Sequence, residues 1–351
     1  MAPNPGKPLR VSDFDYDLPP ELIAQHPPPH RDDSRMMIVD RKTGRVGHAR
    51  FREFEAHASP GDMLVLNDTK VIPARVWGES GEAKVEFLFI GELEPGLWDV
   101  LCRPARRIRQ GDSLYFAPGF EARVEGIGEE GKRLLRFHRT DVRAELRKIG
   151  YAPLPPYIKR SREDLSARPE DLNRYQTVFA RKEGAIAAPT AGLHFTEETL
   201  AGLTAKGIDI RRVTLDVGLA TFQPVRVDIV TEHKMLEELY SISPAAARHI
   251  SAAKAEGRPV TAVGTTVVRT LESAWMDGRV RPGRRATSLF IYPGFEFHVV
   301  DRLLTNFHLP KSTLLMLVAA FAGHDLIMSA YREAVRERYR FFSYGDCMLI
   351  V

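Results

Sequence analysis

The stretch Lys84-Val-Glu-Phe-Leu-Phe-Ile90 marks the part of this chain that differs most in pattern from the rest. It is one of several short runs between about Trp77 and Leu135 that Gly and Pro turns separate. The other runs are Leu97-Trp-Asp-Val-Leu101, Ser113-Leu-Tyr-Phe116, Glu121-Ala-Arg-Val-Glu125 and Leu134-Leu-Arg-Phe137. This spacing is typical of a small antiparallel sheet or barrel. We therefore expect a β-module here.

On both sides of this module, helix-like and strand-like stretches alternate. A helical pattern over 197–206 precedes a strand-like run over 208–215, and one over 245–256 precedes the apolar run 260–263. Such alternation predicts an α/β fold. The expected architecture is a larger α/β catalytic body, residues 13–76 and 151–351, with a β-barrel-like domain inserted at 77–150. Residues 1–12 are expected to be a disordered leader, and the proline-rich bridge 151–157 to be stiff and extended.

Composition limits the class of protein. The 351 residues, 44% of them hydrophobic, suffice for one large or two ordinary domains with a sizeable core. The longest apolar run, Leu314 to Ala322, is about half of what a bilayer requires, and no signal peptide opens the chain, so a cytoplasmic location without membrane contact is expected. Cys102 and Cys347 lack the spacing of a zinc site and are expected to be reduced thiols. No metal is predicted.

Arginine is concentrated in a few segments although the net charge is only +4. These segments are 103–109, 139–148, 279–285 and 332–340. Basic clusters bind phosphates and release counterions, but a solvated surface looks the same in sequence. A polyanionic partner and a plain charged surface therefore both remain open.

The segment Ala187-Ala-Pro-Thr-Ala-Gly-Leu-His-Phe-Thr196 has neither helical nor strand periodicity. It places hydroxyls, a glycine and the imidazole of His194 between apolar flanks, which is typical of a binding site. A simpler interpretation is a helix start with Thr196 as its N-cap. The two interpretations are compatible.

Two further segments combine an apolar strand end with polar groups. Gly264-Thr-Thr266 lies between a strand and a helix carrying Arg269, where free N–H groups and hydroxyls suit a phosphate, a carboxylate or a ribose oxygen. Thr305-Asn-Phe-His308 precedes a helix that Ser312 is expected to cap, and Asn306 and His308 would need partners if buried. A plain capped turn is the alternative for Gly264-Thr-Thr266.

Together with other motifs, these segments carry a resemblance to a known family. The additional motifs are Leu66-Asn-Asp-Thr-Lys-Val-Ile-Pro-Ala-Arg75, Pro153-Leu-Pro-Pro-Tyr-Ile158, Tyr175-Gln-Thr177, Val217-Gly-Leu-Ala-Thr-Phe-Gln-Pro-Val-Arg226, Phe290-Ile-Tyr-Pro-Gly294 and Tyr339-Arg-Phe-Phe-Ser-Tyr-Gly-Asp346. In this order they closely resemble the S-adenosylmethionine:tRNA ribosyltransferase-isomerases of queuosine biosynthesis. The resemblance runs from about Phe14 to the C-terminus.

The resemblance implies that the ribosyl group of S-adenosylmethionine is transferred to 7-aminomethyl-7-deazaguanine at the tRNA wobble position. Epoxyqueuosine-tRNA, adenine and methionine are the products, and no cofactor is expected because S-adenosylmethionine is consumed. The reaction needs a base for a C5′ proton and an acid for the leaving adenine. The candidate catalytic residues are His194, Asp68 and Asp346. The candidate substrate-binding residues are Tyr175, Gln176, Thr190, Gly192, Thr265, Thr266, Arg269, Asn306 and His308, of which Tyr175 and Gln176 would hold a flipped base.

The chain departs from the family pattern at a few positions. Asp216 and Leu236 stand where the family usually has histidine, Val267 where it has serine and Ala220 where it has glycine. Three alternatives therefore stay open: a paralogue with a different acceptor, a tRNA-binding protein without catalysis, and a methyltransferase. The last is disfavoured because no Gly-rich loop follows a first strand. A monomer is expected, because no obvious apolar surface is left for pairing.

Overall fold

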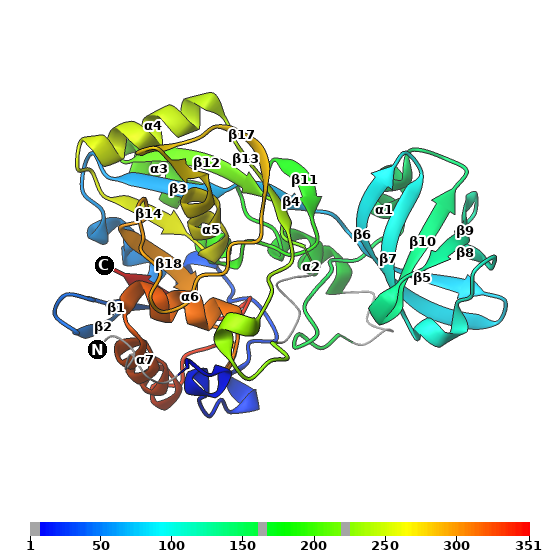
Figure 1. Ribbon diagram of the computed structural model, residues 1–351, viewed down its shortest axis with the longest axis horizontal. Helices are drawn as coiled ribbons and strands as arrows, with labels where there is room; N and C mark the ends of the chain where they lie inside the picture. The colour runs from blue at the N-terminus through cyan, green and yellow to red at the C-terminus, as the bar shows by residue number, and fades with distance from the viewer. Residues whose placement is uncertain (1–7, 161–166, 219–224) are drawn as a thin grey trace.

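The computed structural model describes residues 8–160, 167–218 and 225–351. It consists of a larger α/β body and a closed β-barrel to one side of it (Figure 1). The expected fold class is therefore confirmed. In the body, one nine-stranded sheet has the order β17-β13-β12-β3-β14-β18-β19-β1-β2.

The strands of this sheet are short, and those at its centre are parallel. β12, β3, β14 and β18 run parallel to one another. The pairs β12–β13, β13–β17, β18–β19 and β1–β2 are antiparallel, and β1 runs parallel to β19. Their bounds are β1 Arg35–Val39, β2 Val46–Arg50, β3 Met63–Asn67, β12 Asp209–Leu215, β13 Glu238–Ile242, β14 Val260–Val263, β17 Gly283–Thr287, β18 Arg302–Asn306 and β19 Cys347–Ile350. Two small pairs accompany it, β4 Thr69–Val71 with β11 Lys182–Ala185, and β15 Trp275–Met276 with β16 Arg279–Val280.

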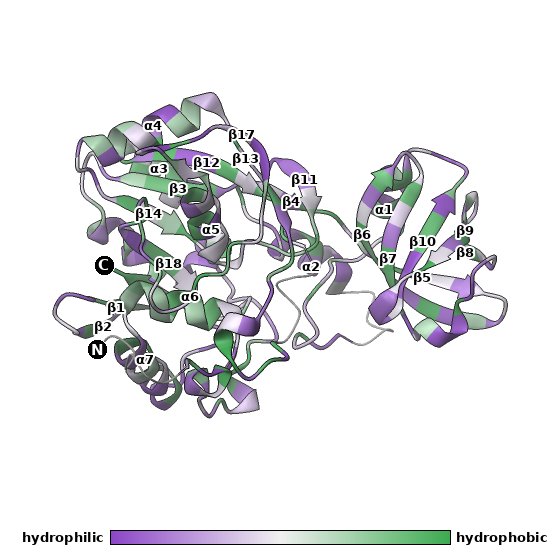
Figure 2. Ribbon diagram, in the orientation of Figure 1, coloured by the Kyte–Doolittle hydropathy of each residue, from purple (hydrophilic) through white to green (hydrophobic). Residues whose placement is uncertain are grey.

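Helices cover both faces of the sheet, and all five residues of the central strand β3 are therefore buried. Met63 and Val65 face one core, which includes apolar residues of α4 to α7, and Leu64 and Leu66 face a second core with Leu203. The helices are α2 Ala167–Arg174, α3 Glu197–Ala205, α4 Pro244–Ala255, α5 Thr265–Ala274, α6 Thr313–Ala322 and α7 His324–Arg336. In Figure 2, α6 is mostly green, whereas the edge strand β17 is largely purple.

The barrel has the strand order β10-β7-β6-β5-β8-β9. Its strands are β5 Arg75–Ser80, β6 Ala83–Glu94, β7 Leu97–Arg103, β8 Ser113–Ala117, β9 Phe120–Ile127 and β10 Lys132–Phe137. All the expected runs in this segment are strands, and aromatic side chains such as Trp98 and Phe120 fill the interior. Helix α1, Val142–Ile149, packs its Val142 and Leu146 onto this core.

Several local expectations are met. Thr196 caps α3 by accepting from Thr199 N, and Ser312 caps α6 by accepting from Leu315 N. Cys102 and Cys347 are free and buried. Of the leader 1–12, which was expected to be disordered, residues 1–7 lie outside the described residues. Its remainder packs on the body: Arg10 bridges to Ile229, and Val11 is buried in the 3-10 helix Val11–Phe14.

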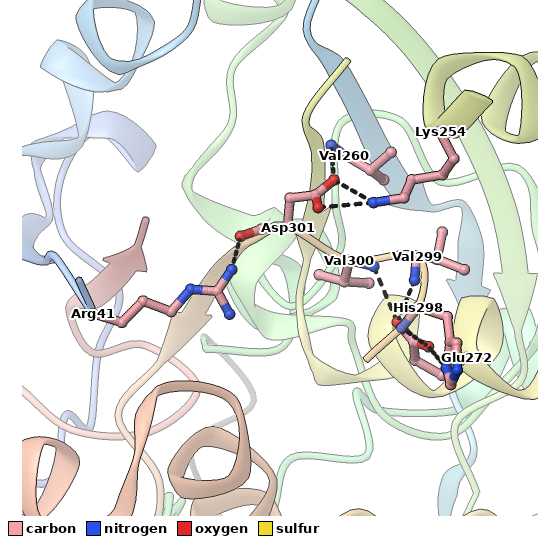
Figure 3. Close-up of polar contacts among 8 residues, drawn as sticks. All are labelled: Arg41, Lys254, Val260, Glu272, His298, Val299, Val300 and Asp301. Atoms are coloured by element: carbon pink, nitrogen blue, oxygen red, sulfur yellow. Dashed lines mark hydrogen bonds and ion pairs between the residues drawn. The ribbon is translucent and has the colours of Figure 1, made fainter. Parts of the chain in front are cut away.

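A buried carboxylate fixes the loop that leads into β18. Glu272 on α5 accepts hydrogen bonds from the backbone amides of His298, Val299 and Val300, at 2.9–3.1 Å (Figure 3). Next to it, Asp301 accepts from Lys254 Nζ and from Val260 N. These contacts hold β18 against β14, and so position the ends of both strands.

Candidate active site

A cavity lies at the carboxyl ends of β14 and β18, and we call it the main cavity. Its volume is about 390 Å³. Ligands in α/β proteins commonly bind at this edge of a sheet. Its walls come from segments far apart in sequence, namely Pro156, Tyr157, Tyr175, 187–191, Val217, Val225, 264–266, 305–314, Phe342 and Ser343. The expected site residues Tyr175, Thr190, Thr265, Thr266, Asn306 and His308 all belong to this wall.

The N-terminus of helix α5 lies in the wall of the main cavity. Gly264 is the N-cap residue with φ 91° and ψ 154°, a backbone conformation that favours glycine, and it forms no side-chain cap. Its carbonyl accepts from Val267 N and Val268 N, which leaves the amides of Thr265 and Thr266 for a ligand. Such a helix start attracts anions. Asn67 donates to Thr266 Oγ1 at 3.4 Å and steadies this end.

His308 is the histidine that reaches the cavity wall. Its Nε2 lies 2.9 Å from Thr305 Oγ1, its backbone N donates to Tyr331 Oη, and its carbonyl accepts from Tyr16 Oη. Burial lowers the pKa of His308 to about 3. The imidazole is therefore neutral at pH 7 and held in place by its own segment.

His194 lies behind the cavity wall rather than in it. Its Nδ1 is 3.0 Å from Ser34 Oγ and its Nε2 is 3.3 Å from Oδ1 of Asn306, which does line the cavity. Burial lowers the pKa of His194 to about 4, so this imidazole is neutral as well. In this structure, His194 reaches the cavity only through Asn306.

The two carboxylates expected to be catalytic are not at the main cavity. Asp68 is buried and accepts from Thr214 Oγ1 at 2.6 Å. Asp346 is buried and accepts from the backbone amides of Arg35 and Arg340 at 2.9 and 2.8 Å. Burial raises the pKa of Asp346. Its contacts join β1 to the C-terminal segment.

Three expected binding residues are also occupied elsewhere. Gln176 pairs through both amide atoms with the backbone of Val71 at 3.1 Å. Gly192 gives room to Phe179, because a Cβ there would lie 2.7 Å from that ring. Arg269 forms a buried ion pair with Glu238 and donates to Leu289 O. Tyr175 does line the cavity but is only 1% exposed, so it offers an edge rather than a stacking face.

The aromatic side of the cavity, formed by Tyr157 and Phe342, was not predicted from the sequence. Tyr157 and Phe342 pack at a centroid distance of 4.7 Å, and Tyr157 Oη lies 2.7 Å from Ser343 Oγ. Burial raises the pKa of Tyr157 to about 12. Both aromatic residues lie within motifs that carry the resemblance, and that membership was the available signal.

The departures from the family pattern lie at different places. Asp216 lines a second cavity, described below, whereas Leu236 is 44% exposed on the surface. Val267 is fully buried in α5, so a hydroxyl at this position would face the core. Ala220 lies outside the described residues. Of the three departures that the structure describes, Asp216 is the one that lies in the lining of a cavity.

Two further observations concern sites of other kinds. Within the described ranges, no group of three or more His, Cys, Asp or Glu side chains is arranged to hold a metal ion. No single described helix is long and apolar enough to span a membrane. Helices α6 and α7 taken together have the length and composition of a membrane span, but they are bent by 118° relative to each other.

Comparison with known proteins agrees with the resemblance. The profile of the family described as "Queuosine biosynthesis protein" matches residues 11–350. A relative from Symbiobacterium thermophilum, named S-adenosylmethionine:tRNA ribosyltransferase-isomerase, is 52% identical over 348 residues, which are 98% of this chain and 100% of the relative. One of the same name from Thermotoga maritima is 50% identical over 344 residues, again 98% and 100%. A crystal structure of S-adenosylmethionine tRNA ribosyltransferase from Thermotoga maritima is 42% identical, covers 97% of this chain and 100% of its own, and has a TM-score of 0.55.

An α/β body with an inserted barrel and matches of this extent define a tRNA-modifying transferase. More narrowly, the chain belongs to the S-adenosylmethionine:tRNA ribosyltransferase-isomerase family of queuosine biosynthesis, and it is an enzyme of that class.

Proposed function

We propose that the protein transfers and isomerises the ribosyl group of S-adenosylmethionine onto 7-aminomethyl-7-deazaguanine at the tRNA wobble position. The products are epoxyqueuosine-tRNA, adenine and methionine. The observation that supports this most is the main cavity, which combines an open helix N-terminus, a neutral imidazole and an aromatic wall. A cavity of about 390 Å³ is in the range used for small-molecule substrates.

We assign the two ends of S-adenosylmethionine, the donor, to different parts of the main cavity. The methionine carboxylate is assigned to the free amides of Thr265 and Thr266, where the α5 dipole favours negative charge. The adenine is assigned to the apolar side near Tyr157 and Phe342. Thr190, another residue of the wall, offers a hydroxyl for the ribose.

The reaction also requires proton transfer at the main cavity. A base removes a C5′ proton that the sulfonium acidifies, adenine leaves as its ring nitrogen takes a proton, and the acceptor amine attacks as the neutral form. His308 lines the cavity as a neutral imidazole, and its low pKa makes it a weak base, so we assign it to a hydrogen bond with the substrate rather than to proton removal. His194 acts as a positioning residue that orients Asn306. Asp68 and Asp346 are assigned to bracing, because their oxygens bind groups outside the cavity.

The acceptor is a base of a large RNA, so phosphate contacts are needed outside the cavity. Arg106 and Arg107 on the barrel are exposed and suit this purpose. S-adenosylmethionine is proposed as a substrate, without a separate cofactor. We also propose that the protein acts as a monomer and in the cytoplasm.

The experiment is a product analysis. The purified protein is incubated with S-adenosylmethionine and tRNA carrying 7-aminomethyl-7-deazaguanine, and adenine release is followed with the mass of the digested nucleoside. Adenine together with a ribosyl-derived mass gain is expected. Release of S-adenosylhomocysteine would indicate methyl transfer instead, and tRNA binding without products a non-catalytic protein. His308→Gln is expected to lower the rate at least about tenfold, and His138→Gln, exposed on the barrel, serves as the matched control.

A paralogue with a different acceptor is the second candidate, since Asp216 alters the lining of a cavity next to the main one. Adenine release with tRNA that carries an unmodified wobble guanine, but not with 7-aminomethyl-7-deazaguanine, would favour it.

A further inference from the structure

A second cavity of about 320 Å³ lies on the side of the body that faces the barrel. We call it the second cavity. It is lined by Lys182, Glu183, Thr214, Asp216, Leu239, Tyr240, Ser241 and Arg284. β11, β13 and β17 supply most of these residues, and in Figure 1 they lie on the side of the body toward the barrel. None of these residues belongs to the wall of the main cavity.

Strand register explains why these side chains meet. Thr214 of β12 pairs with Ser241 of β13, and Ser241 pairs with Arg284 of β17, so the three form one row across the sheet. In the next row, Asp216 N donates to Leu239 O. Residues two apart on a strand share a face, so both rows point to the same side.

The lining offers separate groups for different parts of a nucleotide. Lys182 Nζ is 3.2 Å from Ser241 Oγ, and Arg284 is exposed at the edge strand, so both cations can meet a phosphate. The carboxylate of Asp216 is held by Thr69 Oγ1 at 3.1 Å and can accept from an N–H or O–H group. Leu239, 42% exposed, gives apolar surface to a base.

The charged groups around Asp216 suit a polyanionic ligand better than a single bound ion. Burial raises the pKa of Asp216, and Arg284, Arg143 and Lys182 oppose this shift. Cations therefore lie near Asp216, and one of them, Arg143, comes from α1 of the barrel unit. The second carboxylate of the lining, Glu183, pairs with Lys70 at 3.3 Å. On the same side, Arg147 of α1 pairs with Glu183 at 3.0 Å. The second cavity therefore lies where the body and the barrel unit approach each other.

The two cavities are adjacent along the chain. Val217 lines the main cavity and Asp216 the second, and the segment from Lys182 to Ala188 passes from one to the other. We propose that the second cavity binds a nucleotide next to the modified one in tRNA, with its phosphate on Lys182 and Arg284 and its base or ribose on Asp216. This inference rests on the proposed function, because a tRNA base must enter the main cavity.

The test is direct tRNA binding by the full-length protein at several salt concentrations. Lys182→Ala combined with Arg284→Ala is expected to raise the Kd for tRNA about tenfold at physiological salt and to reduce the slope of log K against log salt by about 0.7 per cation removed. Asp216→Asn, which keeps the size of the side chain, is expected to raise the Kd about fivefold with an unchanged slope. Affinity for S-adenosylmethionine should stay the same in both variants.

Arg248→Ala is the matched control, since Arg248 is exposed on α4, away from both cavities. Thermal melting confirms that each variant is folded. Unchanged tRNA affinity and salt slope in the Lys182 and Arg284 variant would overturn the inference. Loss of affinity that Arg248→Ala reproduces would overturn it as well. Adenine release by the unaltered protein tests the proposed function separately. A failure of the proposed function can therefore be distinguished from a failure of the inference about the second cavity.

Discussion

The Nε2 atom of His194 lies 3.3 Å from Oδ1 of Asn306, which makes a fully enclosed histidine a support of the main cavity. Asn306 Nδ2 donates to Phe342 O, so its Oδ1 is an acceptor and the His194 Nε2 must carry the proton. Nδ1 then accepts from the hydroxyl of Ser34. The chain Ser34–His194–Asn306 thereby fixes one amide at the wall.

Stability is expected to fall in mild acid because of these enclosed imidazoles. Burial lowers the pKa of His194 to about 4 and that of His308 to about 3, from the ordinary 6.5. Below pH 6.5 the unfolded chain binds protons that the folded chain refuses, so the free energy of unfolding decreases as the pH falls. His194→Gln should remove roughly 2 kcal/mol of the decrease between pH 7 and 5. Urea denaturation at both pH values measures it, with His138→Gln as control. An equal decrease in His194→Gln and the unaltered protein would refute the assignment.

Glu272→Ala is expected to destabilise the fold by about 3 kcal/mol, because three backbone amides lose a charged acceptor in a buried place (Figure 3). Glu256→Ala removes an ion pair to Arg258 from a side chain that is 58% exposed, so its effect should stay below about 1 kcal/mol. Urea unfolding of both variants makes the comparison. Equal destabilisation would contradict the bracing role of Glu272.

Gly264→Ala is expected to affect both stability and donor binding. At φ 91° and ψ 154° an alanine is strained by about 1–3 kcal/mol, and relief of the strain would move the amides of Thr265 and Thr266. Gly257→Ala is the matched control, because Gly257 also has positive φ, 69°, but follows α4. Calorimetric titration with S-adenosylmethionine should show weaker binding only for Gly264→Ala. Unchanged affinity would exclude the α5 N-terminus as the carboxylate site.

Replacement of Arg106 and Arg107 by Ala is expected to weaken tRNA binding and to flatten its salt dependence, if the barrel contacts phosphates. Both residues are exposed on a 3-10 turn after β7. Each phosphate contact contributes about 0.7 to 0.9 to the slope of log K against log salt. Arg248→Ala, exposed on α4, is the comparison. An unchanged slope would mean that the barrel only braces the body.

Much of the architecture could be predicted from local pattern. Short runs separated by turns predicted the barrel, and alternating periodicity predicted the α/β body, because both depend on which residues of one segment face a core. The caps Thr196 and Ser312 were predictable for the same reason. What the patterns missed were partners distant in sequence.

The sequence by itself determined the fold class, the family motifs and the segments that form the main cavity, since each is written in neighbouring residues. Only the tertiary structure decided which side chains of those motifs face the cavity. His308 and Thr265 do, whereas His194, Asp68, Asp346, Gln176 and Arg269 bind partners elsewhere. Strand register, which brings Thr214, Ser241 and Arg284 into one row, is likewise set by packing across the sheet. A motif shows that a polar group is present, but burial and its nearest partner decide what that group can do.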